Sequence, residues 1–337
     1  MSISRFQYER WTPAGLSTVW TSCVILAALA VAPLVLPATA VEKLTTLWIY
    51  ILLAVVWNLL AGFAGLVSVG QQAFFGLSAY LTLRLVEWGL NPWLALVGAA
   101  FIAGAIAIPI SLYALKLKAG EFAIATWVIA EVVRICVMFD PLVQGDTGNS
   151  LIALNAYAPD FRRDVTYWLG LVAMAGFLVL TFRVLRSKIG SAAQAVRDDE
   201  EAALSVGVSV MQTKRIIFVL AAFGTALAGS IWLASAITFL PRTNFGVQWT
   251  VFMLFMVLVG GLRTFEGPIL GALIFFVLQE SFSSYGVWYL FGLGFIAIVF
   301  ALALPDGLWG LIRQKRGGDL LPMGTLLKQA PIENEAS

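Results

Sequence analysis

The 337-residue sequence contains no histidine, and charged residues make up only 12% of it. The missing histidine removes the commonest general base and the commonest transition-metal ligand in proteins. Histidine-based catalytic triads and zinc sites of the HExxH type are therefore excluded, and we expect no metal site, no cofactor and no enzymatic activity in this chain. The GxxxxGK[ST] phosphate-binding loop is also missing, so we expect ATP to be used only by partner subunits.

Cysteine is scarce as well. The two cysteines, Cys23 and Cys136, both lie in apolar stretches, where a cysteine is more often a small packing residue than half of a disulfide. The formal net charge is only +2. Such a balance gives no reason to expect a nucleic-acid partner.

Apolar residues, in contrast, are abundant. Hydrophobic side chains make up 60% of the chain and the mean hydropathy is +0.90, far above the usage of soluble domains. A bilayer accommodates this surface when the chain crosses it as helices, whose backbone polar groups are satisfied internally. The composition therefore predicts an all-α, polytopic integral membrane protein, surrounded by membrane lipid, in the cell inner (plasma) membrane.

Uncharged windows, divided at flanking charges and at Gly or Pro breaks, predict about ten transmembrane segments. The uncharged stretch 44–83 is too long for one span, and Gly62-Phe-Ala-Gly65 is the natural place to divide it. Short glycine-containing pieces in 64–86 and 247–283 leave a second interpretation open, with about eight full spans and two broken or re-entrant ones. The segments are 20–41, 44–62, 64–86, 93–115, 119–138, 166–183, 214–236, 247–262, 267–283 and 286–304.

The N-terminus carries Arg5 and Arg10 before an uncharged stretch, an arrangement that loosely imitates a signal peptide. The apolar part of this stretch has about 20 residues, whereas a signal-peptide core has about 7 to 15. We interpret it as a retained first helix. The predicted layout is a cytoplasmic N-terminal segment (1–19), a transmembrane domain (20–305) and a cytoplasmic tail (306–337).

Placing both termini in the cytoplasm satisfies the positive-inside rule. Most of the 21 Lys and Arg residues then lie inside. Arg134 lies within a span, and the residues left outside are Lys43, Arg84, Arg162, Arg163 and Arg242.

Two loops are long enough to carry function, an external loop at 139–166 and a cytoplasmic loop at 184–213. The cytoplasmic loop contains an alanine-rich stretch that predicts a helix from Ser191 to Val206. Ser191 suits its N-cap, and Gly207 suits its C-terminal end.

Within the cytoplasmic loop, Glu201-Ala202-Ala203 is followed four residues later by Gly207. This spacing matches the EAA---G signature of ABC-importer permeases. Small alanines let a short helix seat closely in a groove of another protein, an acidic residue orients it by charge, and the glycine permits the following turn. The alternative is an ordinary solvated connecting helix.

Three longer stretches extend this resemblance over roughly residues 44–312. They are NLLAGFAGLVSVGQQAFFGLSAY (58–80), LKLKAGEFAIATWVIAEVVR (115–134) and MVLVGGLRTFEGPILGA (256–272). In order and spacing they resemble branched-chain amino acid ABC transporter permeases of the LivM type. The resemblance implies a permease domain at 20–305 that couples to partner ATPases through Glu201, Ala202, Ala203 and Gly207.

The resemblance also implies the partners: a homologous second permease subunit forming a heterodimer, two cytoplasmic ABC ATPase subunits, and an extracytoplasmic solute-binding protein. The sequence departs from the family's usual pattern at Gln71-Gln72 and at the run Gly145 to Asn149. These departures leave the substrate open between branched-chain amino acids and the urea or short-chain amides that related permeases handle.

Polar residues at membrane depth are costly and usually face protein or a water-filled path. Asn58, Ser68, Gln71 and Gln72 are therefore candidates for the translocation path, the alternative being interhelical hydrogen bonds. Glu131 and Arg134 are three residues apart and share one helix face. They form either a structural ion pair or a gate or substrate contact in the path.

An ion-coupled secondary transporter is the competing class, because such proteins place titratable groups at a midplane site. Glu131 and Glu280 are the main carboxylates that such a mechanism would use. No convincing internal repeat accompanies them.

Overall fold

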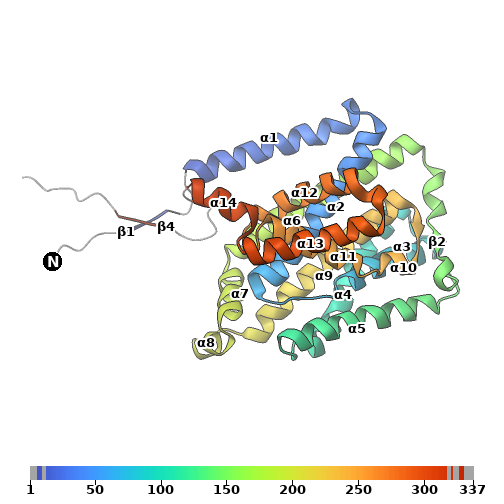
Figure 1. Cartoon of the computed structure of the whole chain (residues 1–337). Coiled ribbons are helices and arrows are strands. Elements are labelled where there is room, and N and C mark those ends of the chain that lie inside the picture. Colours follow the sequence, from blue (N-terminus) through green and yellow to red (C-terminus); the bar gives the residue numbers. More distant parts are fainter. Residues whose placement is uncertain (1–5, 10–12, 317–319, 322–325, 330–337) are drawn as a thin grey trace, which may run out of the picture.

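The computed structural model describes residues 6–9, 13–316, 320–321 and 326–329, so parts of the predicted N-terminal segment and tail lie outside the described residues. Helices dominate these residues (Figure 1). They are α1 (Pro13–Val35), α2 (Ala38–Trp57) continued by the π-helix η1 (Asn58–Phe63), α3 (Gln72–Glu87), α4 (Pro92–Ala114), α5 (Ala119–Met138), α6 (Pro159–Leu185), α7 (Lys188–Asp198), α8 (Glu200–Ser205), α9 (Val210–Ala236), α10 (Pro241–Asn244), α11 (Gln248–Gly260), α12 (Gly267–Phe282), α13 (Val287–Ala303) and α14 (Gly307–Arg316).

Short elements complete the described chain. Three 3-10 helices are present: η2 (Gly145–Thr147), η3 (Ile152–Ala156) and η4 (Ser283–Tyr285). Strand β1 (Phe6–Glu9) pairs antiparallel with β4 (Leu326–Gln329), outside the bundle, and β2 (Asn149–Ser150) pairs antiparallel with β3 (Thr238–Phe239). The second pair ties the loop after α5 to the end of α9.

Seven helical segments are long and apolar enough to cross a membrane, by length and composition alone. They are Gly15–Val35, Ala38–Phe63, Pro92–Ala114, Pro159–Leu185, Val210–Ala236, Pro241–Gly260 and Gly267–Tyr285. α13 and α14, which are bent by 43° relative to each other, form a further candidate as a pair. The prediction of an all-α polytopic membrane protein is confirmed at this level.

Several predicted segment boundaries differ from the helix boundaries; the segment predicted at 64–86, for example, is helical only from Gln72. The first predicted span, 20–41, is divided in the structure, because α1 ends at Val35 and Pro37 stands at the N-cap of α2. The nearest charges are those of Glu42 and Lys43, so the prediction places the division there instead of at Pro37. The span predicted at 166–183 begins earlier, at Pro159, because a proline at N1 starts the helix before its charged first turns. The loop after α5 is therefore shorter than predicted.

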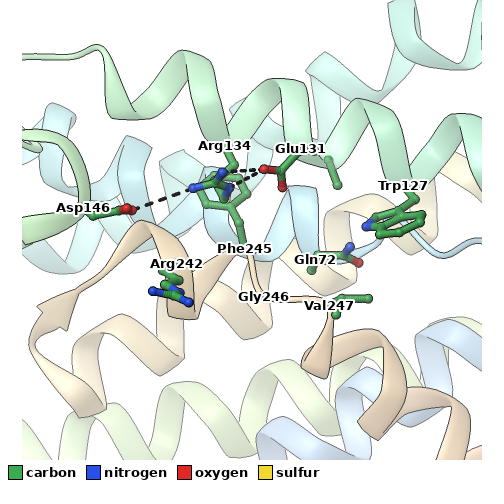
Figure 2. A pocket seen from close by; sticks show the side chains of 10 residues that line it. Gln72, Trp127, Glu131, Arg134, Asp146, Arg242, Phe245, Gly246 and Val247 are labelled. Carbon is green, nitrogen blue, oxygen red and sulfur yellow. Dashed lines mark hydrogen bonds and ion pairs between the residues drawn. The ribbon is translucent and has the colours of Figure 1, made fainter.

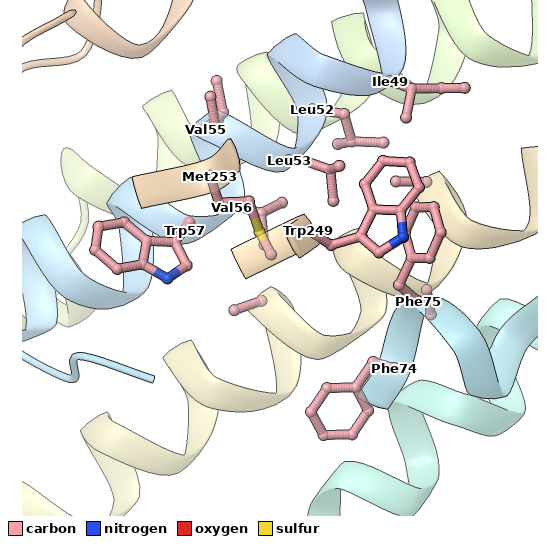
Figure 3. Packing of buried hydrophobic residues seen from close by; sticks show 14 of the residues in the cluster. Ile49, Leu52, Leu53, Val55, Val56, Trp57, Phe74, Phe75, Trp249 and Met253 are labelled. Atoms are coloured by element: carbon pink, nitrogen blue, oxygen red, sulfur yellow. The ribbon is translucent and has the colours of Figure 1, made fainter. Parts of the chain in front are cut away.

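Helix α2 is the centre of the bundle. Almost nine tenths (89%) of the apolar window that it forms with η1 is buried inside the protein, against 11% for α1. Figure 3 shows Leu53 and Val56 of α2 close to Trp249 and Met253 of α11, with Phe75 of α3 beside the Trp249 ring. A helix that is buried on all sides must be apolar all round, as α2 is from Leu47 to Trp57.

Helices α4 and α9 form another close pair. One side of α4 carries alanines at intervals of four residues, all fully buried: Ala95, Ala99, Ala103 and Ala107. Small residues at this spacing let two membrane helices approach closely, which increases their van der Waals contact.

Candidate functional site

Two of the membrane helices are interrupted, and Asn58, in the π-helix η1 that precedes one interruption, hydrogen-bonds to the other. Its side chain accepts a hydrogen bond from the Arg263 N–H (3.1 Å) and donates one to the Thr264 carbonyl (2.8 Å). Residues 262–265 lie in the connection between α11 and α12, where the helical hydrogen-bond pattern is interrupted, so Asn58 supplies partners that the Arg263 N–H and the Thr264 carbonyl need at this depth. Of the two interpretations open for this residue, its contacts support the interhelical hydrogen bond.

The connection 64–71, between η1 and α3, is the other interruption. The helix ends at Phe63 and Gly65 adopts φ +70°, so the predicted division at Gly62 to Gly65 is confirmed. The Ser68 carbonyl accepts from the Trp57 indole N–H at 3.1 Å, and the Ser68 hydroxyl accepts from the Gly70 N–H at 3.2 Å. Polar backbone groups of this buried, irregular connection therefore have hydrogen-bond partners close by.

A cavity of about 540 Å³ lies between α5, the loop after it, and the α10–α11 region (Figure 2). We name it the Arg134 cavity. Its lining residues come from elements far apart in sequence, and they combine charged, amide and aromatic side chains: Gln72, Trp127, Ala130, Glu131, Arg134, Asp146, Arg242, Phe245, Gly246 and Val247.

Ion pairs organise one side of this cavity. Arg134 Nε donates to the Glu131 carboxylate at 3.0 Å, and Nη1 of Arg134 lies 3.8 Å from Asp146. The predicted i, i+3 pair therefore exists. Arg242 also lines the cavity, and it makes no hydrogen bond or ion pair with another described residue. The cavity thus contains both an exposed carboxylate and an unpaired guanidinium.

Gln72, Glu131 and Arg134 are the predicted path residues that the structure brings together. Gln72 is almost fully buried, and its Oε1 accepts a hydrogen bond from the Thr250 hydroxyl. Gln71 points elsewhere, accepting from Thr225 at 3.2 Å. Asn58 and Ser68 likewise do not line this cavity.

Three residues that line the Arg134 cavity are not predicted from the sequence: Trp127, Asp146 and Arg242. Asp146 and Arg242 lie in loops that the sequence places outside the spans, so hydropathy treats them as solvated. A charged residue directly after Pro241, at a predicted span entrance, is the one available signal.

The loop between α6 and α9 contains the EAA---G residues, and it folds as two helices instead of the single predicted helix 191–206. Ser187 caps α7, accepting from the Ile189 N–H at 3.2 Å. Asp199 then breaks the helix and caps α8, accepting from the N–H groups of Glu201 and Ala202 at 3.0 Å each. Asp is a strong N-cap residue, and this preference overrides the continuous alanine-rich pattern.

Helix α8 ends in a Schellman turn at Gly207. The Gly207 N–H donates to the Leu204 carbonyl and the Val208 N–H to the Ala203 carbonyl, both at 3.0 Å. Gly207 has φ +86°, which a residue with a side chain adopts only at a cost. The predicted role of Gly207 as the turn residue is confirmed.

The outer surface of α8 is exposed and partly apolar. Ala203 is buried against Val196 and Val210, whereas Glu201, Ala202 and Gly207 are exposed. Leu204 and Val206 are also exposed, at 56% and 78%. These two residues were not predicted, although apolar positions between EAA and the glycine are a readable signal for a protein contact.

Arg197 of α7 connects this loop to the membrane region. Its Nη1 donates to the Gly62 carbonyl at 3.0 Å, and its side chain packs against Gly65 so closely that an added Cβ there would lie 3.0 Å from Arg197 Cγ. The loop therefore contacts the end of η1 and the start of the 64–71 connection.

Residues 39–304, well over half of the chain, match the family model described as branched-chain amino acid transport system / permease component. The chain belongs to this permease family. The resemblance seen in the motifs is therefore confirmed, and the permease is a multi-pass inner-membrane protein of a transporter class, which is not an enzyme class.

Individual relatives agree. The permease is 27% identical to the high-affinity branched-chain amino acid transport system permease protein LivM of Escherichia coli (strain K12), over 86% of this chain and 75% of the relative. It is 26% identical to the LivM protein of Salmonella typhimurium, over 88% of this chain and 77% of the relative. A probable LivM permease of Methanocaldococcus jannaschii is 27% identical over 66% of this chain.

The Gly-rich stretches of the permease coincide with its two helix interruptions. The stretch 58–80 contains η1 and the 64–71 connection, and the stretch 256–272 contains the connection between α11 and α12. Asn58 hydrogen-bonds one to the other. Among the residues that the structure describes, no group of three or more His, Cys, Asp or Glu side chains is placed to hold a metal ion.

A cluster around Asp140 fixes the opposite end of α5. The Tyr80 hydroxyl donates to the Asp140 carboxylate, Arg84 Nη2 donates to it at 2.6 Å, and the Leu142 N–H donates to it at 2.9 Å. Burial alone would raise the pKa of Asp140, but these hydrogen bonds and the Arg84 charge outweigh it and hold that pKa below its usual range.

Proposed function

We propose that this permease forms half of the translocation path of an ATP-driven importer for branched-chain amino acids or related small solutes. The names of the LivM relatives support this substrate class. The observation that carries the coupling role is the exposed α8 turn, which is joined through Arg197 to an interrupted membrane helix. ATP bound by partner subunits would move the turn and bias the membrane helices between two access states.

The proposed topology has ten membrane segments with both termini in the cytoplasm. Seven helices and α13 supply eight of them. α3, which has 16 residues, and α5, which carries Glu121, Glu131 and Arg134, supply the other two. This arrangement places the basic α4–α5 turn and the α7–α8 loop on one side of the membrane, as the positive-inside rule requires.

Two cytoplasmic ATPase subunits are the proposed partners at α8, one contacting each permease of the pair. The Glu201 carboxylate makes no hydrogen bond or ion pair with any described residue, so its charge is available to a basic groove. Leu204 and Val206 would be buried by the same contact. The two alanines contribute through their small side chains. Ala202 lets the ATPase approach α8 closely, and Ala203 packs against Val210 on the buried side of α8.

The proposed second permease covers the outer face of α5. This face exposes Ile124, Trp127 and Val132 together with the Glu131 carboxylate, which is 49% exposed. A charge facing lipid at membrane depth is costly, whereas one facing a homologous subunit lines a shared path. The Arg134 cavity opens on this face, so it would become part of the path between the two subunits.

The chemistry of the Arg134 cavity suits an amino acid delivered by an extracytoplasmic binding protein. Arg242 would attract the substrate carboxylate, and Glu131 and Asp146 would attract its ammonium group. Trp127 and Phe245 provide apolar contact for a branched side chain. Gln72 lies at the base of the cavity and supplies an amide.

An ion-coupled mechanism is less consistent with the observed pairing. Glu131 pairs with Arg134, and Glu280 forms an ion pair with Lys43 of α2. Each carboxylate is therefore paired with a basic side chain, so neither is an isolated acidic group of the kind that an ion-coupled site at the midplane would use.

Reconstitution tests the proposal. ATP-dependent uptake is measured in proteoliposomes that contain the permease and its partner subunits. Glu201→Lys and Gly207→Pro should abolish uptake and its coupling to ATP hydrolysis while membrane insertion persists. The control Glu42→Lys, an exposed site on α2, should retain uptake. Wild-type uptake in both loop variants would refute the coupling role.

A further inference from the structure

Helix α3 is too short to cross the membrane, so one of its ends lies inside the bilayer. It has 16 residues, from Gln72 to Glu87, which at about 1.5 Å per residue span roughly 24 Å. A hydrocarbon core is about 30 Å thick. In the proposed topology Arg84 and Glu87 lie at the external boundary, so the N-terminal end of α3, which follows the irregular connection 64–71, is within the membrane. The positive end of the α3 dipole is therefore buried.

The start of α3 has donors that lack acceptors. Gln71 stands at the N-cap, its side chain makes no capping hydrogen bond, and the first turn contains no acidic residue. The Ala73 N–H donates to the Gly70 carbonyl at 3.0 Å, whereas the N–H groups of Gln71 and Gln72 have no acceptor among the described residues. These are the groups that a helix needs to have capped at its N-terminus.

The Gln72 side chain adds a further donor. Gln72 is only 1% exposed, and its Oε1 accepts a hydrogen bond from the Thr250 hydroxyl. This bond fixes the carboxamide and leaves Nε2, which can only donate, without a partner among the described residues. Gln72 lines the Arg134 cavity, as Figure 2 shows, so Nε2 is a buried donor directed at this space.

Two glycines place the start of α3 directly against the walls of the cavity. A Cβ at Gly70 would lie 2.0 Å from the Thr126 carbonyl oxygen, so the connection before α3 touches the backbone of α5. A Cβ at Gly76, one turn into α3, would lie 2.6 Å from the ring of Phe245, which lines the cavity. Close packing on both sides holds the donors in a fixed position.

We propose that the start of α3 is the carboxylate subsite of the Arg134 cavity, an inference that rests on the proposed function. The substrate carboxylate accepts hydrogen bonds from Gln72 Nε2 and from backbone N–H groups at the helix start, and the α3 dipole stabilises its charge. The ammonium group points to the Glu131 carboxylate, which is 49% exposed. Arg242, an exposed residue, attracts the carboxylate to the cavity, and α3 holds it. Donors without acceptors favour an amino acid over urea or a neutral amide.

Binding of L-leucine to the permease, purified in detergent with its second permease and ATPase subunits but without the binding protein, tests this proposal. L-leucinamide, in which a neutral amide replaces the carboxylate, is the competitor. The wild-type complex should bind leucine about tenfold more tightly than leucinamide, because charge-assisted hydrogen bonds are the stronger ones. Gln72→Glu places a carboxylate where that of the substrate should lie, so it should weaken leucine binding by about tenfold or more.

Two further variants separate charge from folding. Gln72→Met removes the donor without adding a charge, so it should weaken leucine binding several-fold and bring the affinities for leucine and leucinamide closer together. Gln212→Glu makes the acidic change in the first turn of α9, at an exposed site, and should bind like the wild type. Equal binding of leucine and leucinamide by the wild type, or unchanged leucine binding in both Gln72 variants, would overturn the subsite. Leucine uptake that remains ATP-dependent in those cases would leave the proposed function standing.

Discussion

The Arg197 guanidinium of α7 donates a hydrogen bond to the Gly62 carbonyl, with 3.0 Å between Nη1 and the oxygen. This contact joins the loop that carries Glu201 to the end of η1, next to the irregular connection 64–71. The same guanidinium pairs with Asp198, which fixes its direction. A displacement of α7 would therefore be transmitted to the interrupted helix without passing through the lipid-facing part of the bundle.

Arg197→Met should uncouple the loop from the membrane region. The variant keeps much of the apolar stem but loses the donor, so we expect uptake to fall at least tenfold, on the order of 1.4 kcal/mol of lost coupling, while the protein still inserts. ATP-dependent uptake and ATP hydrolysis are measured together in proteoliposomes. Lys188→Met, at the exposed start of α7, is the control and should behave like the wild type. Normal uptake in Arg197→Met would show that the contact is dispensable.

Asn58→Leu should destabilise the protein. The substitution leaves the Arg263 N–H and the Thr264 carbonyl without partners in a buried position, and each unsatisfied group costs about 1 to 3 kcal/mol. Thermal unfolding in detergent should show a lower midpoint than for Asn155→Ala, which removes an exposed hydrogen bond to Arg162. Equal midpoints for the two variants would contradict the bridging role of Asn58.

The sequence predicts the helical class and the interruption at Gly62 to Gly65, because hydropathy and glycine are local signals. It does not predict that Asn58 of η1 hydrogen-bonds to the connection between α11 and α12, since its partners lie more than 200 positions away in the chain. The division between α1 and α2 at Pro37 is also missed, because the prediction places it at the charges of Glu42 and Lys43. Long-range pairing is the feature that local patterns leave undetermined.

Glu131→Gln and Arg242→Gln should change the substrate dependence of uptake. Each variant removes one charge that we propose attracts an end of a zwitterion, so the KM for uptake should rise several-fold, as expected for about 1 kcal/mol of lost attraction. Uptake is measured against substrate concentration in the reconstituted importer. Arg162→Gln, a basic site on α6 that does not line the cavity, serves as the control. An unchanged KM in both cavity variants would remove this cavity from the path.

Asp140→Asn should lower stability by about 1 to 3 kcal/mol, because the neutral amide binds Arg84 less strongly and cannot accept every hydrogen bond. The pKa of Asp140 is lowered in the folded protein. Its stabilising contribution is therefore fully present above the unfolded value of about 3.9 and is lost as the pH falls through the folded pKa. The gap in unfolding midpoint between wild type and variant should persist at pH 7 and narrow below about pH 4.

As with the fold, local sequence patterns predict some residues of the candidate sites and miss others. Glu131 and Arg134 are predicted as a pair from their spacing, and the structure contains the pair. Arg242 reaches the same cavity from a loop distant in sequence, so no spacing rule finds it. On α8, the motif identifies Glu201 and Gly207, whereas the Asp199 cap, which orients the turn, becomes recognisable only once the helix break is seen.

The central claim is that α8 is the docking site of the partner ATPase. A photo-crosslinking amino acid placed at Leu204 tests it most directly, with the same group at the exposed Phe161 of α6 as the control. We expect irradiation of membranes that contain the active importer to yield an adduct between position 204 and the ATPase subunit, and none from position 161. Absence of the ATPase adduct at position 204, or equal adducts from both positions, would contradict the account.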